Sequence, residues 1–360
     1  MKSKDKANMY YKHKSFFINT YILLLIVSMF SACKKENINP TPDVSHIQTP
    51  DFEIVRLERL MGKALPTNYQ QIYSEIETQY PEIFRSYYRN FWGFSENDSF
   101  PRTRIYDSLY ANTDGNPWMR RLMDSVDLEY HEIGDIKNRL TKALTYYKYY
   151  FPDSTLPKFY TYVGPFVYWT LFDSTSMGIE LDMYMGEHFA NFGSFESNMP
   201  QYIITRCARP YIVINIMKSL VDGAIADLGA EASILDAMVA QGKMLYYLDC
   251  MLPDLEDSLK MGYTEEQIIW CGENEGEIWK FLAGQELLFS KRGDEKRRYT
   301  DEAPTSVGMP AQSPGRAAVW TGWQIVRSYM RENPDVDLIE LFNNPDALSI
   351  LKKSGYEPGD

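Results

Sequence analysis

Histidine and cysteine are scarce in this sequence, with four of each among 360 residues, and no histidine follows His188. These two residue types supply most of the protein ligands of zinc. No cysteine and histidine have the spacing of a metal site, and the His-Glu-x-x-His pattern of zinc peptidases does not occur. The sequence therefore predicts no catalytic zinc site, and we expect no other cofactor.

Basic residues are also fewer than acidic ones, with 37 lysines and arginines against 49 aspartates and glutamates. The formal net charge is −12, and residues 1–32 hold five lysines and one aspartate, so the chain from Cys33 onward carries about −16. An acidic surface argues against nucleic acid as a partner and against broad electrostatic attraction to anionic membranes.

Long hydrophobic runs are missing too, because the most apolar stretch, residues 21–30, is too short to cross a bilayer. It follows a lysine-rich segment, which is typical of a signal peptide. The stretch ends in Ser31-Ala-Cys33, which resembles the lipobox of bacterial lipoproteins. We therefore expect residues 1–32 to be a lipoprotein signal peptide and Cys33 to carry the lipid. The alternative is an ordinary signal peptide, or a membrane anchor, with a chance cysteine.

The segment after Cys33 is polar and contains prolines, a composition typical of a flexible tether. We expect residues 33–49 to be this tether and residues 50–358 to form a single domain. Lys34 after the cysteine fits transport to the outer membrane, on either its periplasmic or its outer face. The remaining cysteines have apolar neighbours, so buried thiols are the expected state.

The centre of the domain is predicted at residues 209–254, where two hydrophobic helices are joined by a short polar link. The first begins at Pro210 and is apolar almost all round, which is typical of a helix covered on every side. The second runs from about Ser233 to Leu248 and places Gln241 on its apolar stripe. Two such helices could carry a metal-peptidase site, but the first has no histidine and Gln241 is a poor zinc ligand.

The other segments predict an α+β fold that is mostly helical and has a small sheet. Strand patterns occur at residues 159–172 and 178–185, and residues 52–60 suit either a strand or a short helix. A helix over residues 128–150 would include His131-Glu132, which we interpret as a solvated helix face. Asp182 and His188 flank the end of the second strand, but two side chains do not make a site.

Glu275 lies on the apolar face of a helix that starts at the capping box Thr264–Gln267. A carboxylate in such a position is paired with a basic group or has a raised pKa. The last long helix follows Ser313-Pro-Gly315 and presents Arg316, Trp320, Trp323 and Arg327 on one face. Either arginine is the natural partner of Glu275, and this ladder could pack in the core or bind a carboxylate or sugar. Residues 291–312 read as a long surface loop and a candidate lid.

Several blocks taken together resemble the family of the gliding-motility lipoprotein GldB, over most of residues 50–358. Besides the lipobox they are Ile179-Glu-Leu-Asp-Met-Tyr-Met-Gly186, Gln241-Gly-Lys-Met-Leu-Tyr-Tyr247, Tyr263-Thr-Glu-Glu-Gln267, Trp270-x-x-Glu-Asn-Glu275-x-x-Ile-Trp279 and the segment from Pro314-Gly-Arg to Trp320-Thr-Gly-Trp-Gln-Ile-Val-Arg-Ser-Tyr329.

The resemblance implies membrane attachment and a role in gliding or envelope biogenesis, without a known catalytic activity. The family is also distantly similar to predicted zinc peptidases that carry the His-Glu-x-x-His helix, which implies a zinc-peptidase-like helical domain. Against that pattern, Ile214-Asn-Ile-Met-Lys218 would occupy the ligand helix, and Gln241-Gly242 would replace a Glu-Gly pair.

Two functions remain open. The first is a non-catalytic envelope lipoprotein whose degenerate peptidase-like groove binds or scaffolds another gliding or secretion component. The second is a metal-independent hydrolase that uses Glu275 with Glu273 or Asp249 as an acid/base pair. Glu273 and Glu275 are two residues apart on a helix and point in different directions, so we prefer the binding role. The candidate groove residues are Asn215, Lys218, Gln241, Glu275, Arg316, Trp320, Trp323 and Arg327.

Lipidation of Cys33 can be tested by metabolic labelling with a palmitate analogue. The wild-type chain should be labelled and Cys33→Ala should not, because the predicted acyl chains are attached through this residue. Two or more acyl chains anchor a protein stably, whereas one is marginal. Equal labelling of both chains, or of neither, would contradict the prediction.

Overall fold

The structure is a computed structural model that describes residues 41–93, 107, 117–164, 166–173, 175–187, 189, 199–225, 229, 231–284 and 286–358. The predicted signal peptide, Cys33 and His188 lie outside these residues. Within the predicted tether, Val44 packs against the hydrophobic core and the ring of His46 lies edge-on to Tyr149.

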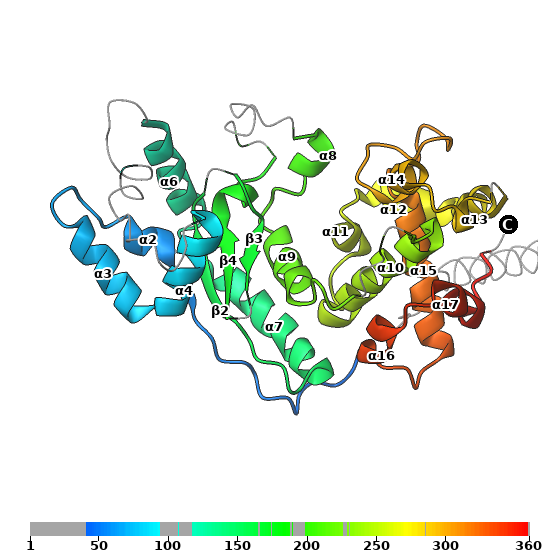
Figure 1. Cartoon of the computed structure of the whole chain (residues 1–360), viewed down its shortest axis with the longest axis horizontal. Helices are drawn as coiled ribbons and strands as arrows, with labels where there is room; N and C mark the ends of the chain where they lie inside the picture. The colour runs from blue at the N-terminus through cyan, green and yellow to red at the C-terminus, as the bar shows by residue number, and fades with distance from the viewer. Residues whose placement is uncertain are drawn as a thin grey trace, which may run out of the picture. The chain divides into compact units, whose positions relative to one another are not determined.

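A small mixed sheet lies among the first helices (Figure 1). Its strands are β1 (Ile54–Arg56), β2 (Lys158–Tyr162), β3 (Thr170–Phe172) and β4 (Ser176–Glu180). The order is β1-β2-β4-β3, with β1, β2 and β4 parallel and β3 antiparallel at one edge. All five residues of β4 are buried, as expected for a parallel strand covered on both faces. The helix α4 packs against β2 and β4, and α9 packs against β3 and β4.

The prediction of a mostly helical α+β fold is confirmed. Residues 52–60, which suited either a strand or a helix, contain both, because β1 leads directly into α2. The helices of this part are α2 (Leu57–Met61), α3 (Tyr69–Gln79), α4 (Pro81–Ser86), α6 (Pro117–Glu129), α7 (Gly134–Tyr150), α8 (Gln201–Ile204) and α9 (Tyr211–Leu220), with the π-helix η1 (Tyr87–Phe91) and the 3-10 helix η2 (Leu181–Tyr184).

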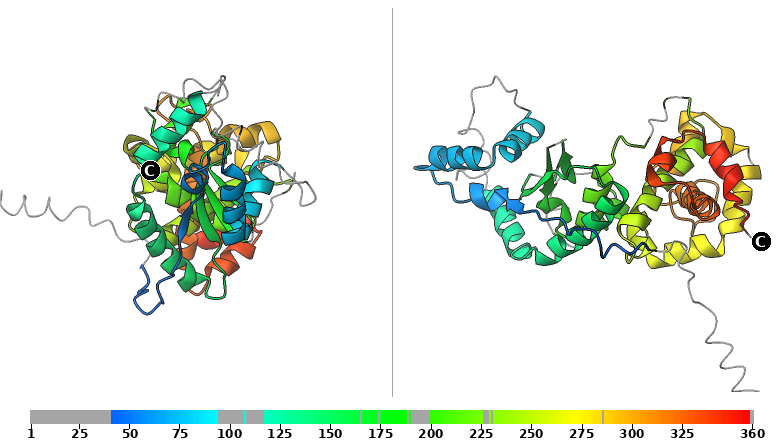
Figure 2. Two further views of the ribbon diagram at one scale, coloured as in Figure 1. Left: turned by 90° about the vertical axis from the view of Figure 1, so that its left-hand side faces the viewer. Right: turned by 90° about the horizontal axis from the view of Figure 1, so that it is seen from below.

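The rest of the chain is helical and is built around α15. Figure 2 (right) shows α15 nearly end-on, surrounded by other helices of this part. Twelve of its sixteen residues are buried, so it is covered on every side. The helices are α10 (Ile234–Met251), α11 (Asp257–Met261), α12 (Glu265–Glu273), α13 (Glu275–Gly284), α14 (Gly293–Thr300), α15 (Ala317–Glu332), α16 (Leu338–Asn343) and α17 (Ala347–Ser354), with the 3-10 helix η4 (Leu287–Phe289).

The two central helices predicted from the sequence are present as α9 and α10, but the main partner of α10 is α15. The helices α10 and α15 touch at a pair of glycines. A Cβ on Gly242 would lie 2.5 Å from the carbonyl oxygen of Gly322, and one on Gly322 would lie 2.1 Å from that of Met238. Only residues without a side chain allow backbones to approach so closely.

Three local predictions were wrong. The helix expected over residues 128–150 is divided between α6 and α7, and His131 and Glu132 are exposed residues of the connection. The helix that holds Glu275 is interrupted at Asn274, between α12 and α13. Residues 291–312 are not one long loop, because they include α14, which contacts α10 and α15.

Other predictions on the helices and cysteines are confirmed. The capping box at Thr264 starts α12, with Gln267 completing it. Cys207, Cys250 and Cys271 are buried free thiols. Within the described ranges, none of the helices combines the length and apolar character needed to cross a membrane.

The close contact of α10 and α15 predicts that Gly322→Ala will destabilise the protein. The added methyl group would overlap backbone atoms of α10, and overpacking of this kind costs about 1–3 kcal/mol or more. Gly272→Ala is the matched control, because a Cβ there meets nothing within 4 Å and alanine favours a helix by roughly 0.5–1 kcal/mol. Denaturant unfolding of both variants would measure the difference. Equal stability of the two would contradict the close packing.

Candidate binding site

The eight groove residues predicted from the sequence do not form one site. Lys218, Gln241 and Arg316 lie near the start of α15, and Asn215 lies one turn before Lys218 on α9. Trp323 and Arg327 lie further along α15, in a second polar cluster, and Trp320 is buried in the core. Glu275 lies apart from both groups, against the C-terminal segment.

Arg316 connects several elements at the start of α15. Its guanidinium donates to the carbonyl oxygen of Met261 (3.3 Å), to the side-chain oxygen of Gln241 (3.3 Å) and to Oε1 of Glu302 (2.9 Å). Its backbone is left-handed, with φ of 65°, which is costly for a residue other than glycine. Such a conformation persists only when the surroundings fix it, and here three contacts hold the side chain in one direction.

A second arginine meets the same carboxylate, and nothing in the sequence indicated this contact. Nη1 of Arg206 lies 2.9 Å from Oε1 of Glu302, the oxygen that Arg316 also contacts. Arg206 packs against Gly262, where a Cβ would lie 2.7 Å from its Cδ. Arg206 and Glu302 are 96 residues apart and belong to no recognisable motif, so only the folded chain brings them together.

Lys218 is the third cation of this group. Burial and the nearby charges of Arg316 and Arg206 lower its pKa to about 7, and the charge of Glu302 opposes this change. Its ammonium group has no hydrogen bond or ion pair with any residue that the structure describes. We call Arg206, Lys218 and Arg316 the basic cluster, and Glu302 is the carboxylate at its centre.

A cavity of about 1130 Å³ lies near the basic cluster. The four side chains of the cluster are not among its described lining residues, but Gly262 of the lining packs against Arg206. The described lining is mostly apolar or uncharged and includes Tyr202, Tyr211 and Tyr263, with Glu187 as the one charged residue. Two of these tyrosines reach the surroundings of the cluster, because Tyr202 donates to the carbonyl oxygen of Glu302 and Tyr263 to that of Gly315.

One face of α9 leads from this cavity toward the basic cluster. Tyr211, Asn215 and Lys218 are spaced at i, i+4 and i+7, so they follow one side of the helix. Asn215 donates a hydrogen bond of 3.0 Å to the hydroxyl oxygen of Tyr184, which fixes its amide. This face therefore runs from an aromatic wall of the cavity to the partly buried ammonium group of Lys218.

The second polar cluster is centred on Asp249 of α10. Its carboxylate accepts hydrogen bonds from Arg327 (2.7 and 2.8 Å), from Lys260 (2.9 Å) and from the indole of Trp323 (2.9 Å). Asp257 binds Arg327 as well (2.8 and 2.9 Å). Burial alone would lower the pKa of Arg327, but the hydrogen bonds and charges of Asp249 and Asp257 raise it above its ordinary value.

This second cluster is electrically balanced, with two cations and two carboxylates. The guanidinium carbon of Arg327 also lies 3.6 Å from the ring centroid of Trp323, which adds a cation–π contact. Every oxygen of Asp249 is occupied by a donor from the chain. The arrangement is therefore suited to holding α10, α11 and α15 together and unsuited to proton transfer to a substrate.

The predicted ion pair of Glu275 with Arg316 or Arg327 is wrong. Both arginines bind other carboxylates, and Oε1 of Glu275 accepts a hydrogen bond of 2.8 Å from the hydroxyl of Tyr356. Burial raises the pKa of Glu275, and the hydrogen bond from Tyr356 opposes the rise. The ring of Tyr356 packs edge-on against Trp279, so Glu275 helps to attach the C-terminal segment to α13.

Glu180 and Asp182 form a pair of buried carboxylates at the end of β4 that the sequence did not identify as a pair. Asp182 accepts from the backbone N–H groups of Gly164 and Phe166, and Glu180 accepts from those of Val167 and Tyr168. Burial raises the pKa of both, and the negative charge of Asp182 adds to the rise at Glu180. They hold the connection between β2 and β3 in place. Within the described residues, no three side chains of His, Cys, Asp or Glu form a group that could hold a metal ion.

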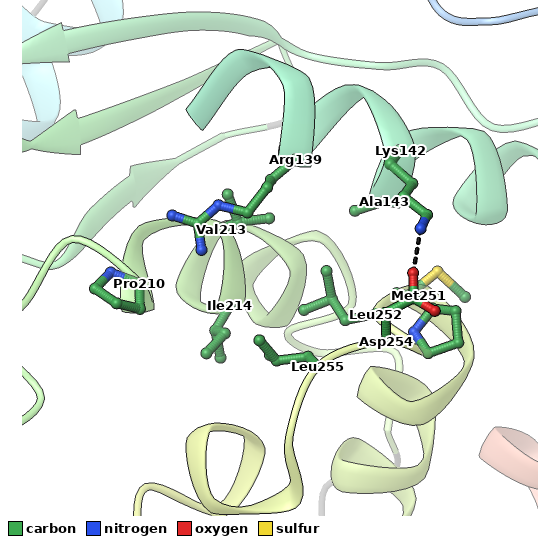
Figure 3. Close-up of a pocket in the computed structure, with 11 residues that line it drawn as sticks. Arg139, Lys142, Ala143, Pro210, Val213, Ile214, Met251, Leu252, Asp254 and Leu255 are labelled. Carbon is green, nitrogen blue, oxygen red and sulfur yellow. Dashed lines mark hydrogen bonds and ion pairs between the residues drawn. The ribbon is translucent and has the colours of Figure 1, made fainter. Parts of the chain in front are cut away.

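A smaller and more apolar pocket of about 200 Å³ lies on another face of α9 (Figure 3). Val213 and Ile214 line it from α9, Ala143 lines it from α7, and Leu252 and Leu255 line it from the connection between α10 and α11. The ion pair of Lys142 with Asp254 crosses one side. Ile214, which stands where the resemblance would place a metal ligand, therefore faces hydrocarbon.

The family model described as gliding motility protein GldB matches residues 37–358. The chain belongs to the GldB family. No match exists among curated proteins or among solved structures. Membership of the GldB family indicates a gliding-motility lipoprotein of the cell envelope.

The match to the GldB family includes every element of both polar clusters. The sequence blocks that carried the resemblance now have structural positions. Gln241-Gly242 combines a contact to Arg316 with the glycine contact to α15, and Glu273 to Glu275 spans the break between α12 and α13. Pro314-Gly-Arg316 forms the turn that directs Arg316 into the basic cluster.

The Asp249 cluster predicts a large stability effect of Asp249→Asn. Arg327 and Lys260 would lose their shared carboxylate, and a half-broken buried ion pair typically costs about 3–5 kcal/mol. Asp254→Asn is the control, because its pair with Lys142 is exposed and worth less than about 1 kcal/mol. Denaturant unfolding at neutral pH measures both. A loss at Asp249 no larger than at Asp254 would show that the network does not stabilise the fold.

Proposed function

We propose that this GldB-family chain is a lipid-anchored protein of the outer membrane that acts by binding and not by catalysis. Its partners in this proposal are other envelope proteins of the gliding or secretion machinery. The cavity near the basic cluster would receive a segment of such a partner. The lipid on Cys33 would keep the domain close to membrane-associated partners.

The main support for the proposal is a contrast between two kinds of charged group. The candidate catalytic carboxylates already have partners within the chain, whereas the basic cluster contains a lysine that has none among the described residues. Asp249 and Glu275 are occupied by contacts within the chain, as described above. Lys218, by contrast, is a basic group without a partner among the described residues, and a cavity large enough for a peptide segment or a small molecule lies near its cluster. Charged groups left unpaired in this way are commoner at functional sites than elsewhere.

The alternative of a metal-independent hydrolase requires Glu275 to work with Asp249 or Glu273 as an acid/base pair. Nothing in the contacts of these residues favours it. Asp249 is held by Arg327 and Lys260, and the hydrogen bond of Glu275 comes from Tyr356. General acid–base catalysis needs a group that can reach the proton of a substrate, so both residues would first have to lose their present partners.

Complementation of a deletion strain tests the binding role. Thr205→Trp places a bulky ring at an exposed position of the cavity lining, so it should abolish complementation while the protein stays at normal abundance. Thr78→Trp is the matched control, since Thr78 is also exposed in the described structure and its hydroxyl also donates to a carbonyl oxygen. It should complement fully.

Glu275→Gln separates the two functions in the same assay. A binding protein should tolerate the change, whereas a general acid or base should lose about two to four orders of magnitude in rate. Full complementation by Thr205→Trp would refute a role for the cavity. Failure of Glu275→Gln at normal abundance and thermal stability would favour the hydrolase.

A further inference from the structure

The basic cluster is an accumulation of positive charge in an acidic protein. Arg206 and Arg316 share the carboxylate of Glu302, which leaves an excess of one positive charge, and protonation of Lys218 adds a second, while the whole chain has a net charge of −12. The balanced Asp249 cluster shows that this fold also builds neutral networks. We propose that the basic cluster binds a single carboxylate or phosphate group of the ligand that enters the cavity, an inference that rests on the proposed binding function.

The geometry around Glu302 shows how such a group would be held. One carboxylate oxygen already lies 2.9 Å from both guanidinium groups, and the Glu302 side chain is 40% exposed. Arginine presents several donors in a fixed plane, which matches the oxygens of carboxylates and phosphates. The ammonium of Lys218 supplies a further donor that no described residue uses.

Holding these basic groups in place is unfavourable for the folding free energy of the chain. A partly buried lysine without a counter-ion opposes folding, because burial favours the uncharged form. Arg316 adopts a left-handed backbone conformation, and Gly262, with φ of 77°, leaves room for Arg206. Nε of Arg206 is buried and has no hydrogen-bond partner in the described structure. A bound anion would satisfy several of these groups at once.

The lining of the cavity limits the rest of the ligand. Tyrosine, phenylalanine, methionine, leucine and proline make up half of the described lining, two threonines and two glutamines add uncharged polar groups, and Glu187 would repel a second negative charge nearby. Aromatic walls with several uncharged polar groups and one carboxylate suit an uncharged body. We therefore expect one anionic group on a largely uncharged molecule or chain end.

Direct anion binding to the full-length chain in a non-ionic detergent tests this inference. Sulfate is the first probe, because its charge stays constant between pH 6 and 8, and ionic strength is matched with chloride. Titration calorimetry should show saturable binding to the wild type. Lys218→Met should weaken it at least tenfold, whereas Lys352→Met, which removes an exposed lysine of α17, should leave it unchanged.

Two further measurements are specific to the cluster. Glu302→Gln removes the competing carboxylate, so sulfate should bind several-fold more tightly. Wild-type affinity should fall several-fold from pH 6 to pH 8, because Lys218 loses its proton near pH 7. The charged groups that face Lys218 are Arg206, Arg316 and Glu302, and Lys218→Met should remove this part of the pH dependence.

Acetate and inorganic phosphate at one pH then distinguish the two sources of the anion. Tighter acetate binding assigns a carboxylate, and tighter phosphate binding assigns a phosphate group. No saturable binding above chloride, or wild-type affinity in Lys218→Met, would overturn the inference. Anion binding together with full complementation by Thr205→Trp would keep the anion site and reject the proposed function. Failed complementation by Thr205→Trp without saturable anion binding would keep the proposed function and reject the anion site.

Discussion

The contact of α10 with α15 at Gly242 and Gly322 is the constraint on which the polar architecture depends. The two backbones touch there without side chains between them. The contacts follow the same order along both helices, with Gln241 near Arg316 and Asp249 near Arg327. Separation of the helices by the width of a methyl group would break hydrogen bonds of about 2.7–3.3 Å at both positions.

The two polar clusters connected by this contact differ in charge balance. Around Asp249, two carboxylates face two cations and the donors are satisfied within the chain. Around Glu302, one carboxylate faces two arginines and the titratable Lys218, which has no partner among the described residues. Buried charges are tolerable when they are paired, so the first cluster serves stability and the second requires another explanation. Binding of an anion from outside the chain provides it.

The sequence predicted the fold class, the hydrophobic helices α9 and α10, the approximate places of β2, β3 and β4, and the capping box of α12. Each of these is encoded by neighbouring residues, through hydrophobic periodicity or through a capping side chain. The strand expected at residues 178–185 ends at Glu180, where the 3-10 helix η2 begins. The family followed from short blocks such as those near Gln241 and Trp320. The sequence also singled out Gln241, a polar group on an apolar helix stripe, and Arg316, on the arginine–tryptophan face of the last long helix. Lys218 was identified only through the resemblance to the ligand helix of zinc peptidases.

The sequence by itself could not determine which charges meet. Helical position suggested that Glu275 pairs with an arginine of α15. In the structure Glu275 accepts a hydrogen bond from Tyr356, Arg327 pairs with Asp249 and Arg316 pairs with Glu302. Arg206 lies 96 residues from Glu302 in the chain, and Arg327 lies 78 from Asp249. Side-chain type and local period thus determined the helices, the buried faces and the family. Only the tertiary structure decided the ion pairs, because a charge interacts through distance in space and the sequence specifies distance only along the chain.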